Sequence, residues 1–331
     1  MTETIQFQPP AGAAFLNALL KGAAQVMFQG NALTGVFFLS GILWGAIAEG
    51  QPSVFIGAVV GLVVSTFTGY ALNRPKSDGA EGVWGFNGIL VGCAFPTFLA
   101  DTPLMWPALI LCAALTTWVR TGFNNVMEAW KVNSFTFPFV FCTWLFLLAA
   151  RMFHGMPPEY LSAPELSMHW GGDIDLSAGL LIVGWLKGIS QVFLLNSWVT
   201  GVLFLIGLYL SNKWAALWAA VGSAVALGVV LLYQGAGSDI ANGLYGFSPV
   251  LTGIALGCTF YRPNKRTAVW ALLGIVVTVF IQGAMDILTL PFGLPSLTAP
   301  FCIATWLFLL PMYRFDEKVP NHSHWHKHNN L

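Results

Sequence analysis

The stretch SFTFPFVFCTWLFLL at residues 134–148 recurs as SLTAPFCIATWLFLL at residues 296–310, with 10 identities in 15 positions. Chance does not produce such a match, so the chain contains an internal repeat. The repeat extends upstream at offsets of 161 to 166 residues, where LKG at 20–22 recurs at 186–188 and TGV at 34–36 recurs at 200–202. These matches predict two homologous halves, residues 10–151 and 178–315, with a linker at 152–177 and a tail at 316–331.

The composition places both halves in a membrane. The 331 residues are 56% hydrophobic and 8% charged, whereas a soluble domain has about 25% charged residues. The mean hydropathy is +0.70. The 14 basic and 14 acidic residues balance, so charge gives no sign of nucleic acid binding. At roughly 20 residues per span the chain has room for about ten transmembrane helices, and a soluble enzyme is excluded.

Each half contains five apolar runs, and an odd number of spans inverts the second half relative to the first. We expect the spans at residues 32–49, 53–72, 83–100, 104–122, 135–151, 197–211, 214–232, 244–261, 267–288 and 297–314. The segments 15–30 and 181–196 precede the two sets and are interrupted by Lys, Gln and Asn. We interpret them as re-entrant half helices buried in protein. The predicted fold class is an all-α integral membrane protein with ten transmembrane helices and two half helices, in two inverted repeats around a central pore.

The distribution of basic residues gives this map an orientation. If the N-terminus lies in the cytoplasm, twelve of the 14 Lys and Arg residues fall on the cytoplasmic side of the membrane, and only Arg151 and Lys187 fall on the other side. We therefore expect both termini in the cytoplasm, including the His-rich tail at 316–331. The linker at 152–177 is expected to be extracytoplasmic.

The expected spans carry almost no chemistry for catalysis. Glu49, Asp239 and Asp286 fall at predicted span ends, where solvation explains them. The histidines lie in the linker and the tail, and the five cysteines are scattered singly, without metal-ligand spacing. The tail motif HSHWHKH is interpreted as a polar chain end rather than a weak metal site. We expect neither an enzyme nor a cofactor.

The repeat pairs neutral polar groups with aromatic and aliphatic ones. The pairs are Gln25 with Gln191, Thr136 with Thr298, Phe86 with Phe247 and Leu90 with Leu251. Pairs of this kind in inverted halves meet near the midplane, where such folds bind their solute.

A proline lies two residues after each paired threonine, as Pro138 and Pro300. If a helix continued through the proline, the carbonyls of Ser134 and Ser296 would lack donors. Alternatively the proline stands near the start of a half helix, where no donor is needed. In both cases short rows of backbone oxygens are expected beside the threonines, as acceptors for a small neutral solute with N–H groups.

These residues resemble the urea transporter family. The sequence LPSLTAPF at 294–301 fits that family's LPxxTxPF signature in full, and VNSFTFPF at 132–139 keeps its TxPF end. GFNGILVG at 85–92 adds to a resemblance that covers nearly the whole chain. It implies a channel-like facilitator in the cell inner membrane, a homotrimer with one narrow pore per protomer, through which urea passes down its gradient.

The resemblance also implies roles for individual residues. Thr136 and Thr298 would flank a central site, surrounded by Val26, Val192, Leu90 and Leu251. Phe28, Phe86 and Phe247 would form slots against the urea plane, with Leu195 as the remaining slot wall. Gln25 and Gln191 would hydrogen-bond the solute or hold the oxygen rows.

Two other functions stay open. The solute could be another small neutral molecule, such as a short amide, ammonia or glycerol. An ammonia channel would have paired histidines in the pore, and an aquaporin-type glycerol channel would have two Asn-Pro-Ala motifs; the sequence has neither. The chain could also be a membrane subunit that transports nothing.

Overall fold

The computed structural model describes residues 12–72, 76–163 and 177–315. Within these ranges the regular elements are helices, joined by loops and one isolated β-bridge between Leu99 and Pro158. In the first half the helices are α1 (Gly12–Gln25), α2 (Ala32–Ala48), α3 (Pro52–Leu72), α4 (Lys76–Ala80), α5 (Phe86–Phe98), α6 (Met105–Met127), η1 (Glu128–Trp130) and α7 (Phe137–Ala150). The second half contains α8 (Ala178–Ser190), η2 (Gln191–Phe193), α9 (Trp198–Ser211), α10 (Lys213–Leu232), α11 (Gly237–Ala241), α12 (Phe247–Ile254), η3 (Ala255–Thr259), α13 (Lys265–Thr289), η4 (Leu290–Phe292) and α14 (Ala299–Leu309).

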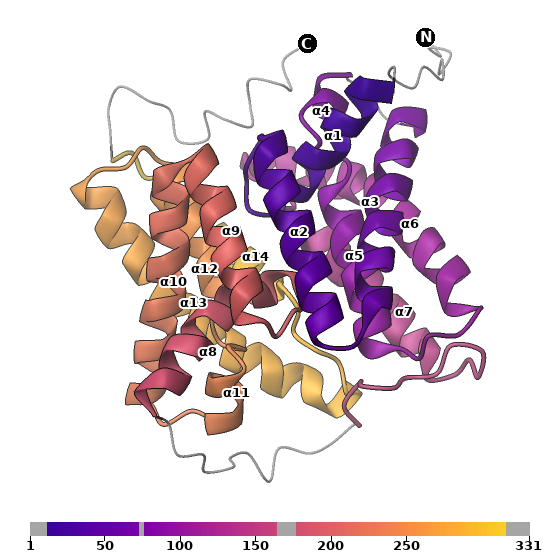
Figure 1. The fold of residues 1–331 in the computed structure, drawn as a ribbon. Coiled ribbons are helices and arrows are strands. Elements are labelled where there is room, and N and C mark those ends of the chain that lie inside the picture. Colours follow the sequence, from indigo (N-terminus) through magenta and orange to yellow (C-terminus); the bar gives the residue numbers. More distant parts are fainter. Residues whose placement is uncertain (1–11, 73–75, 164–176, 316–331) are drawn as a thin grey trace.

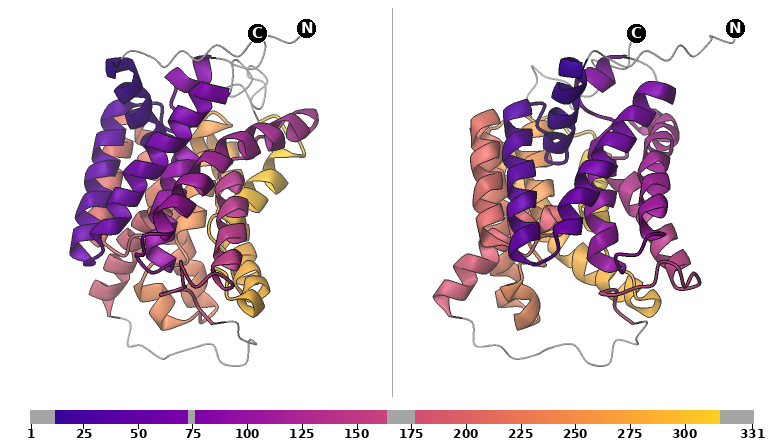
Figure 2. Two further views of the ribbon diagram at one scale, coloured as in Figure 1. Left: turned by 90° about the vertical axis from the view of Figure 1, so that its right-hand side faces the viewer. Right: turned by 45° about the vertical axis from the view of Figure 1, so that its right-hand side comes forward.

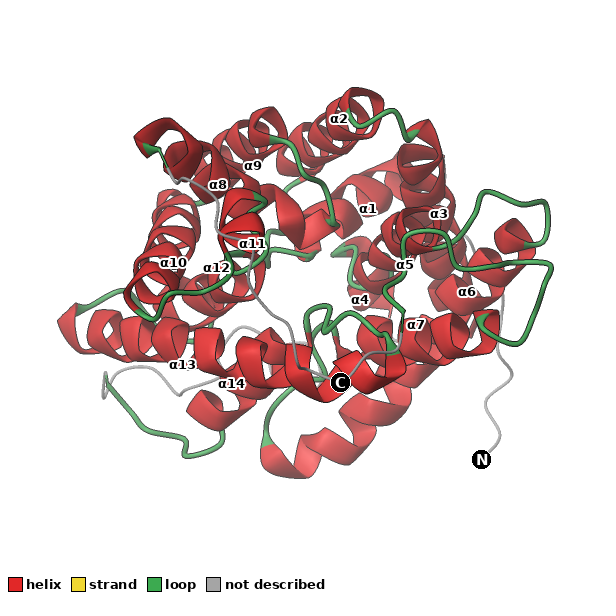
Figure 3. Ribbon diagram, turned by 90° about the horizontal axis from the view of Figure 1, so that it is seen from below, coloured by secondary structure: helices red, strands yellow, loops and turns green. Residues whose placement is uncertain are grey.

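The two halves lie side by side and meet along α2 and α9 (Figure 1). The hydroxyl of Thr34 on α2 donates to the carbonyl of Gly207 on α9, and the hydroxyl of Thr200 on α9 donates to the carbonyl of Gly41 on α2, both at 2.8 Å. Seen from below, the helices of both halves surround a common centre (Figure 3).

Local sequence explains where the helices begin. The side chain of Asn31 accepts the N–H of Leu33 at the start of α2, and Asn212 and Asn264 cap α10 and α13 in the same way. Such caps replace the water that free backbone donors would otherwise bind.

The segments expected to be re-entrant end in tight turns. Helix α1 ends at Gln25 and α8 at Ser190, and the chain then turns before α2 and α9 begin. Helix α8 with η2 is bent by 72° relative to α9. Because the turns break the helices, neither segment continues straight into the next helix.

The structure has a helix at each position where an apolar run was expected, although several are short. Three helices of the described residues are long and apolar enough to cross a membrane, namely Pro52–Leu72, Lys213–Leu232 and Lys265–Phe292, and the bent pair would make a fourth. The other apolar helices have 10–17 residues. The helices of both halves pack together, with several tilted relative to one another (Figure 2). The number of spans therefore stays a prediction. The His-rich tail and linker residues 164–176 lie outside the described residues.

Glycines allow close packing of α3 against α5. A Cβ built on Gly61 would lie 2.1 Å from the carbonyl oxygen of Gly88, and one on Gly57 would lie 2.2 Å from that of Gly92. Because the obstacle is backbone, a rotamer change cannot relieve these contacts. The facing glycines of α3 and α5 let the two helices approach closely. This packing positions α5, whose first residue is the buried Phe86.

We predict that Gly61→Ala destabilises the protein by about 1–3 kcal/mol through overpacking. Gly228→Ala is the matched control, because a Cβ there meets nothing within 4 Å. Thermal unfolding of the detergent-purified variants, followed by tryptophan fluorescence, measures the effect. Equal midpoints for the two variants would contradict this account of α3–α5 packing.

Candidate functional site

Thr136 and Thr298 come from different halves of the chain and their hydroxyls are hydrogen-bonded. The two Oγ1 atoms lie 2.7 Å apart, and each residue is 3% exposed. Thr136 precedes α7 and Thr298 precedes α14. The Sγ atom of Cys302, one turn into α14, lies 3.4 Å from Thr136 Oγ1. The pair expected from the repeat therefore meets directly.

The prolines stand at helix starts, which decides between the two geometries left open by the sequence. Pro138 and Pro300 lie in the first turns of α7 and α14. The carbonyl of Ser134 accepts the N–H of Phe137 at 2.9 Å, and that of Ser296 accepts the N–H of Ala299 at 3.2 Å. The geometry with both carbonyls unbonded is therefore wrong. Each carbonyl oxygen still has a second lone pair for a solute.

The loops that carry the threonines are each anchored to the other half by a tryptophan. The indole N–H of Trp144 donates to the carbonyl of Pro295, and that of Trp306 donates to the carbonyl of Asn133, both at 2.8 Å. The two bonds are reciprocal. Trp144 in α7 binds the loop before α14, and Trp306 in α14 binds the loop before α7.

Four residues around the threonines have left-handed backbone conformations. The φ angle is 49° at Phe135, 50° at Leu297, 62° at Phe28 and 60° at Leu194. Non-glycine residues rarely adopt this conformation, and such strain persists where the surrounding structure enforces it, often at functional sites. Strain at two repeat-related pairs points to this region as a site.

Two cavities extend from the threonine pair. The smaller has a volume of about 10 Å³ and the larger about 540 Å³. The smaller is lined by Gln25, Val26, Phe28, Phe86, Arg120, Asn124, Asn133, Ser134, Phe135 and Thr136. The repeat offsets of 161 to 166 carry these ten residues onto ten that line the larger cavity: Gln191, Val192, Leu194, Phe247, Gln282, Asp286, Pro295, Ser296, Leu297 and Thr298.

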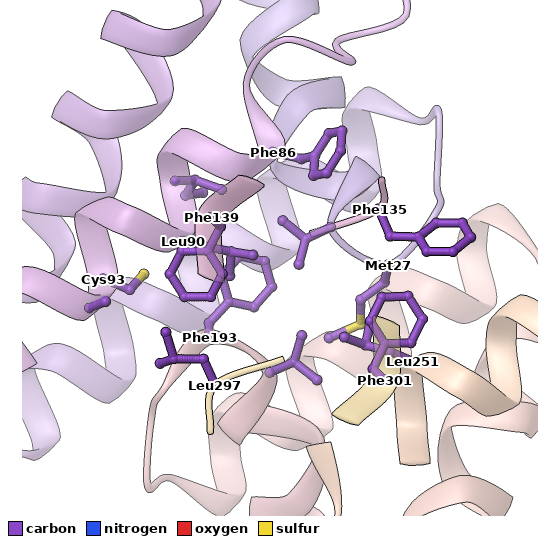
Figure 4. Packing of buried hydrophobic residues seen from close by; sticks show 14 of the residues in the cluster. Met27, Phe86, Leu90, Cys93, Phe135, Phe139, Phe193, Leu251, Leu297 and Phe301 are labelled. Carbon is purple, nitrogen blue, oxygen red and sulfur yellow. The ribbon is translucent and has the colours of Figure 1, made fainter. Parts of the chain in front are cut away.

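Nine of the twelve residues proposed from the sequence line these cavities. Gln25, Val26, Phe28, Phe86 and Thr136 line the smaller one, and Gln191, Val192, Phe247 and Thr298 line the larger one. Leu90 and Leu251 are fully buried in the core near Phe139 and Phe301 and line neither cavity (Figure 4).

The assignment of the remaining slot wall to Leu195 needs correction. The structure places Leu194 in the lining of the larger cavity. Leu195 is 1% exposed, and its methyl groups lie 3.2 Å from the position of a Cβ built on Gly45 in α2. The offset of 166 that relates Gln25 to Gln191 also relates Phe28 to Leu194, so a strict offset would have found it.

The two glutamines hold loops. Gln25 Nε2 donates to the carbonyl of Glu81, and Gln191 Nε2 donates to the carbonyl of Asn242, both at 3.0 Å. These bonds tie the C-terminal ends of α1 and α8 to the turns that precede α5 and α12. Both glutamines also line the cavities, Gln25 the smaller one and Gln191 the larger one.

Phe28 and Phe135, which line the smaller cavity, belong to a larger aromatic cluster. Phe28 and Phe135 pack edge to face with centroids 6.3 Å apart, and Phe260 and Phe301 complete the cluster at 5.5–5.9 Å. Rigid apolar walls of this kind favour a flat solute.

The sequence analysis did not identify four polar residues of α6 and α13 that line the cavities, namely Arg120, Asn124, Gln282 and Asp286. Arg120 is 6% exposed and lies 3.6 Å from Asp78. Asp286 accepts a hydrogen bond from the side chain of Ser296. Asp239, in the short helix α11 outside the expected spans, has its pKa raised by burial, opposed by a hydrogen bond from Ser238. The spacing of four between Arg120 and Asn124, and between Gln282 and Asp286, was the available signal, because such residues share a helix face.

Within the ranges that the structure describes, no three His, Cys, Asp or Glu side chains cluster in a way that would hold a metal ion. The arrangement instead offers hydroxyl, amide and carbonyl groups between apolar walls. Such a lining can replace the water around a small neutral polar molecule.

Comparison with known proteins identifies relatives over most of the chain. The sequence model of the family described as "Urea transporter" matches residues 16–313. Urea transporter 1 of Ovis aries is 31% identical over 316 residues, which cover 94% of this chain and 80% of that protein. Urea transporter 1 of Rattus norvegicus is 30% identical over 308 residues, covering 91% of this chain and 78% of that protein.

Proposed function

The chain belongs to the urea transporter family, and we propose that it conducts urea passively through the two cavities that meet at Thr136 and Thr298. Transport of this kind makes no covalent change, so the protein is not an enzyme. The observation that carries the proposed path is the hydroxyl pair at 2.7 Å between two cavities lined by ten repeat-related positions.

The bond between the threonine hydroxyls is weak enough for a solute to replace it. A neutral hydrogen bond contributes about 0.5–1.5 kcal/mol net, comparable with the thermal energy of about 0.6 kcal/mol. Urea has four N–H donors and one acceptor oxygen. It can therefore insert between the hydroxyls, donating to one and accepting from the other, without large movement of the helices.

Selectivity follows from what the path offers to other solutes. Removing an ion from water into an apolar site costs tens of kcal/mol unless a counter-charge compensates it. The threonine pair and its apolar neighbours carry no charge. Neutral planar molecules that hydrogen-bond on their edges are therefore favoured over ions.

We infer the following residues as the solute-binding set of the path: Gln25, Val26, Phe28, Phe86, Thr136, Gln191, Val192, Leu194, Phe247 and Thr298. Leu90 and Leu251 support it from the core. In this proposal Phe28 and Phe86 face one surface of the urea plane in the smaller cavity, and Leu194 with Phe247 does the same in the larger one.

We also propose the architecture that the sequence repeat predicts: ten spans in two inverted halves, residues 10–151 and 178–315, in the cell inner membrane. The reciprocal bonds of Thr34 with Gly207 and of Thr200 with Gly41 support a two-fold relation between the halves. A homotrimer rests on the family resemblance alone, and native mass spectrometry of the purified protein would count its copies.

The orientation is tested with a membrane-impermeant maleimide on intact cells. Cysteine introduced by Glu159→Cys, in the linker, is predicted to be labelled from outside. Cysteine introduced by Lys131→Cys, between α6 and α7, is predicted to be protected until the cells are opened. Both positions are exposed in the structure. The reverse pattern would invert the topology.

We predict that Thr298→Val lowers urea flux several-fold, because one lost hydrogen bond of about 1 kcal/mol corresponds to about fivefold in rate. Thr305→Val is the matched control. Thr305 lies in α14, the helix that Thr298 precedes, and it is fully buried. Among the described residues its hydroxyl has no hydrogen-bond partner, and it lines neither cavity.

Flux is measured by stopped-flow light scattering of proteoliposomes, with empty liposomes as the baseline and acetamide and glycerol as comparison solutes. Full urea flux in Thr298→Val, or an equal loss in Thr305→Val, would remove Thr298 from the path. Urea flux no faster than in empty liposomes, from folded wild-type protein, would overturn the proposed function.

A further inference from the structure

The two cavities differ in charge at positions that the repeat makes equivalent. Arg120 and Asn124 of α6 line the smaller cavity, and Gln282 and Asp286 of α13 line the larger cavity at the same offset of 162. Arg120 is paired with Asp78. The larger cavity thus has a carboxylate where the smaller one has a neutral amide.

Asp286 is joined by a second carboxylate. Asp239 also lines the larger cavity and is close enough to Asp286 for their charges to repel. The hydrogen bonds to these carboxylates come from the hydroxyls of Ser238 and Ser296, which are neutral. Among the described residues, neither carboxylate forms an ion pair with a Lys, Arg or His side chain.

Arg151 and Lys187 contact residues of the cavity lining, but within the described ranges neither forms an ion pair with Asp239 or Asp286. Arg151 donates to the carbonyls of Ser162 and Gly293 at 2.7 and 2.8 Å. Lys187 interacts with Glu49, a third carboxylate of the lining, which also accepts the N–H of Asn196 at 2.7 Å. Glu49 is therefore compensated, whereas Asp239 and Asp286 are not.

An independent feature of the same wall is an unused acceptor. Gln282 is 2% exposed and lines the cavity one helical turn before Asp286. Its Nε2 donates to the carbonyl of Leu244, but its Oε1 is buried without a hydrogen-bond partner. A buried acceptor in this state has lost its hydrogen bond to water, and a ligand with N–H groups would restore a hydrogen bond to it.

The chemistry of this wall defines a ligand class. Two uncompensated carboxylates and an amide oxygen are all acceptors, so the complementary ligand is a cation with several N–H donors. Tyr245 lies within electrostatic range of both carboxylates, and Phe247 lines the same cavity. Aromatic faces attract planar delocalised cations.

We propose that the larger cavity binds small planar amidinium or guanidinium cations at Asp239, Gln282 and Asp286. The cation is held there and does not pass the uncharged threonine pair. This binding is a property separate from urea conduction, and it is measured without any flux.

Acetamidinium and acetamide are the probes, because they have similar shapes and differ in charge. Saturation-transfer NMR of their methyl protons, on the full-length protein in detergent at pH 8, gives a Kd for each. We expect acetamidinium to bind at least about tenfold more tightly than acetamide, since charge-assisted hydrogen bonds are about twice as strong as neutral ones. Raising the salt concentration should weaken acetamidinium binding alone.

Asp286→Asn should raise the Kd of acetamidinium about tenfold and leave that of acetamide unchanged. Glu128→Gln, which removes the same charge from an exposed residue outside the cavity, should change neither. If Asp286→Asn does not fold, as judged by thermal unfolding, Asp239→Asn provides the same test. Equal affinity for the two probes, or tight acetamidinium binding in these variants, would overturn the proposal.

Discussion

The hydrogen bond between the hydroxyls of Thr136 and Thr298 is the constraint on which the rest of the structure depends. Two residues separated by 162 positions can meet only if the loops before α7 and α14 are brought to the same point. Trp144 and Trp306 fix those loops, each bound to the loop of the other half. The strained backbone at Phe135 and Leu297 follows, because the chain must turn sharply to present the next residue at the contact.

Matched hydrogen bonds between the two halves explain how the threonine contact is held in place. Two sets of bonds between the halves are matched: those of Thr34 and Thr200 at the contact of α2 with α9, and those of Trp144 and Trp306 at the threonine loops. Matched bonds of this kind hold the two halves at one relative position. A conducting path through the contact then needs only local rearrangement of hydroxyls, which agrees with a facilitator that draws on no energy source.

The apolar runs predicted the positions of the helices, and the repeat predicted the threonine pair, because equivalent residues in two related halves occupy equivalent places. The family resemblance added residues such as Val26, Phe28 and Val192, which line the two cavities. Prediction from the sequence failed where the position of a side chain depends on the exact course of a tight turn, or on a helix far away in the sequence. The family resemblance points to Leu195 as the slot wall, whereas Leu194 lines the cavity and Leu195 is buried against α2, because neighbouring residues in this tight turn point in different directions. Asp239 and Asp286 seemed solvated because sequence cannot show that α11 brings one carboxylate to the other.

The central claim is that urea replaces the bond between the two threonines. A high-resolution crystal structure of the protein soaked in urea tests it most directly. The account predicts urea between Thr136 Oγ1 and Thr298 Oγ1, within hydrogen-bond distance of both, with the two oxygens more than about 4 Å apart. An intact hydroxyl pair, with urea bound only away from it, would contradict the account.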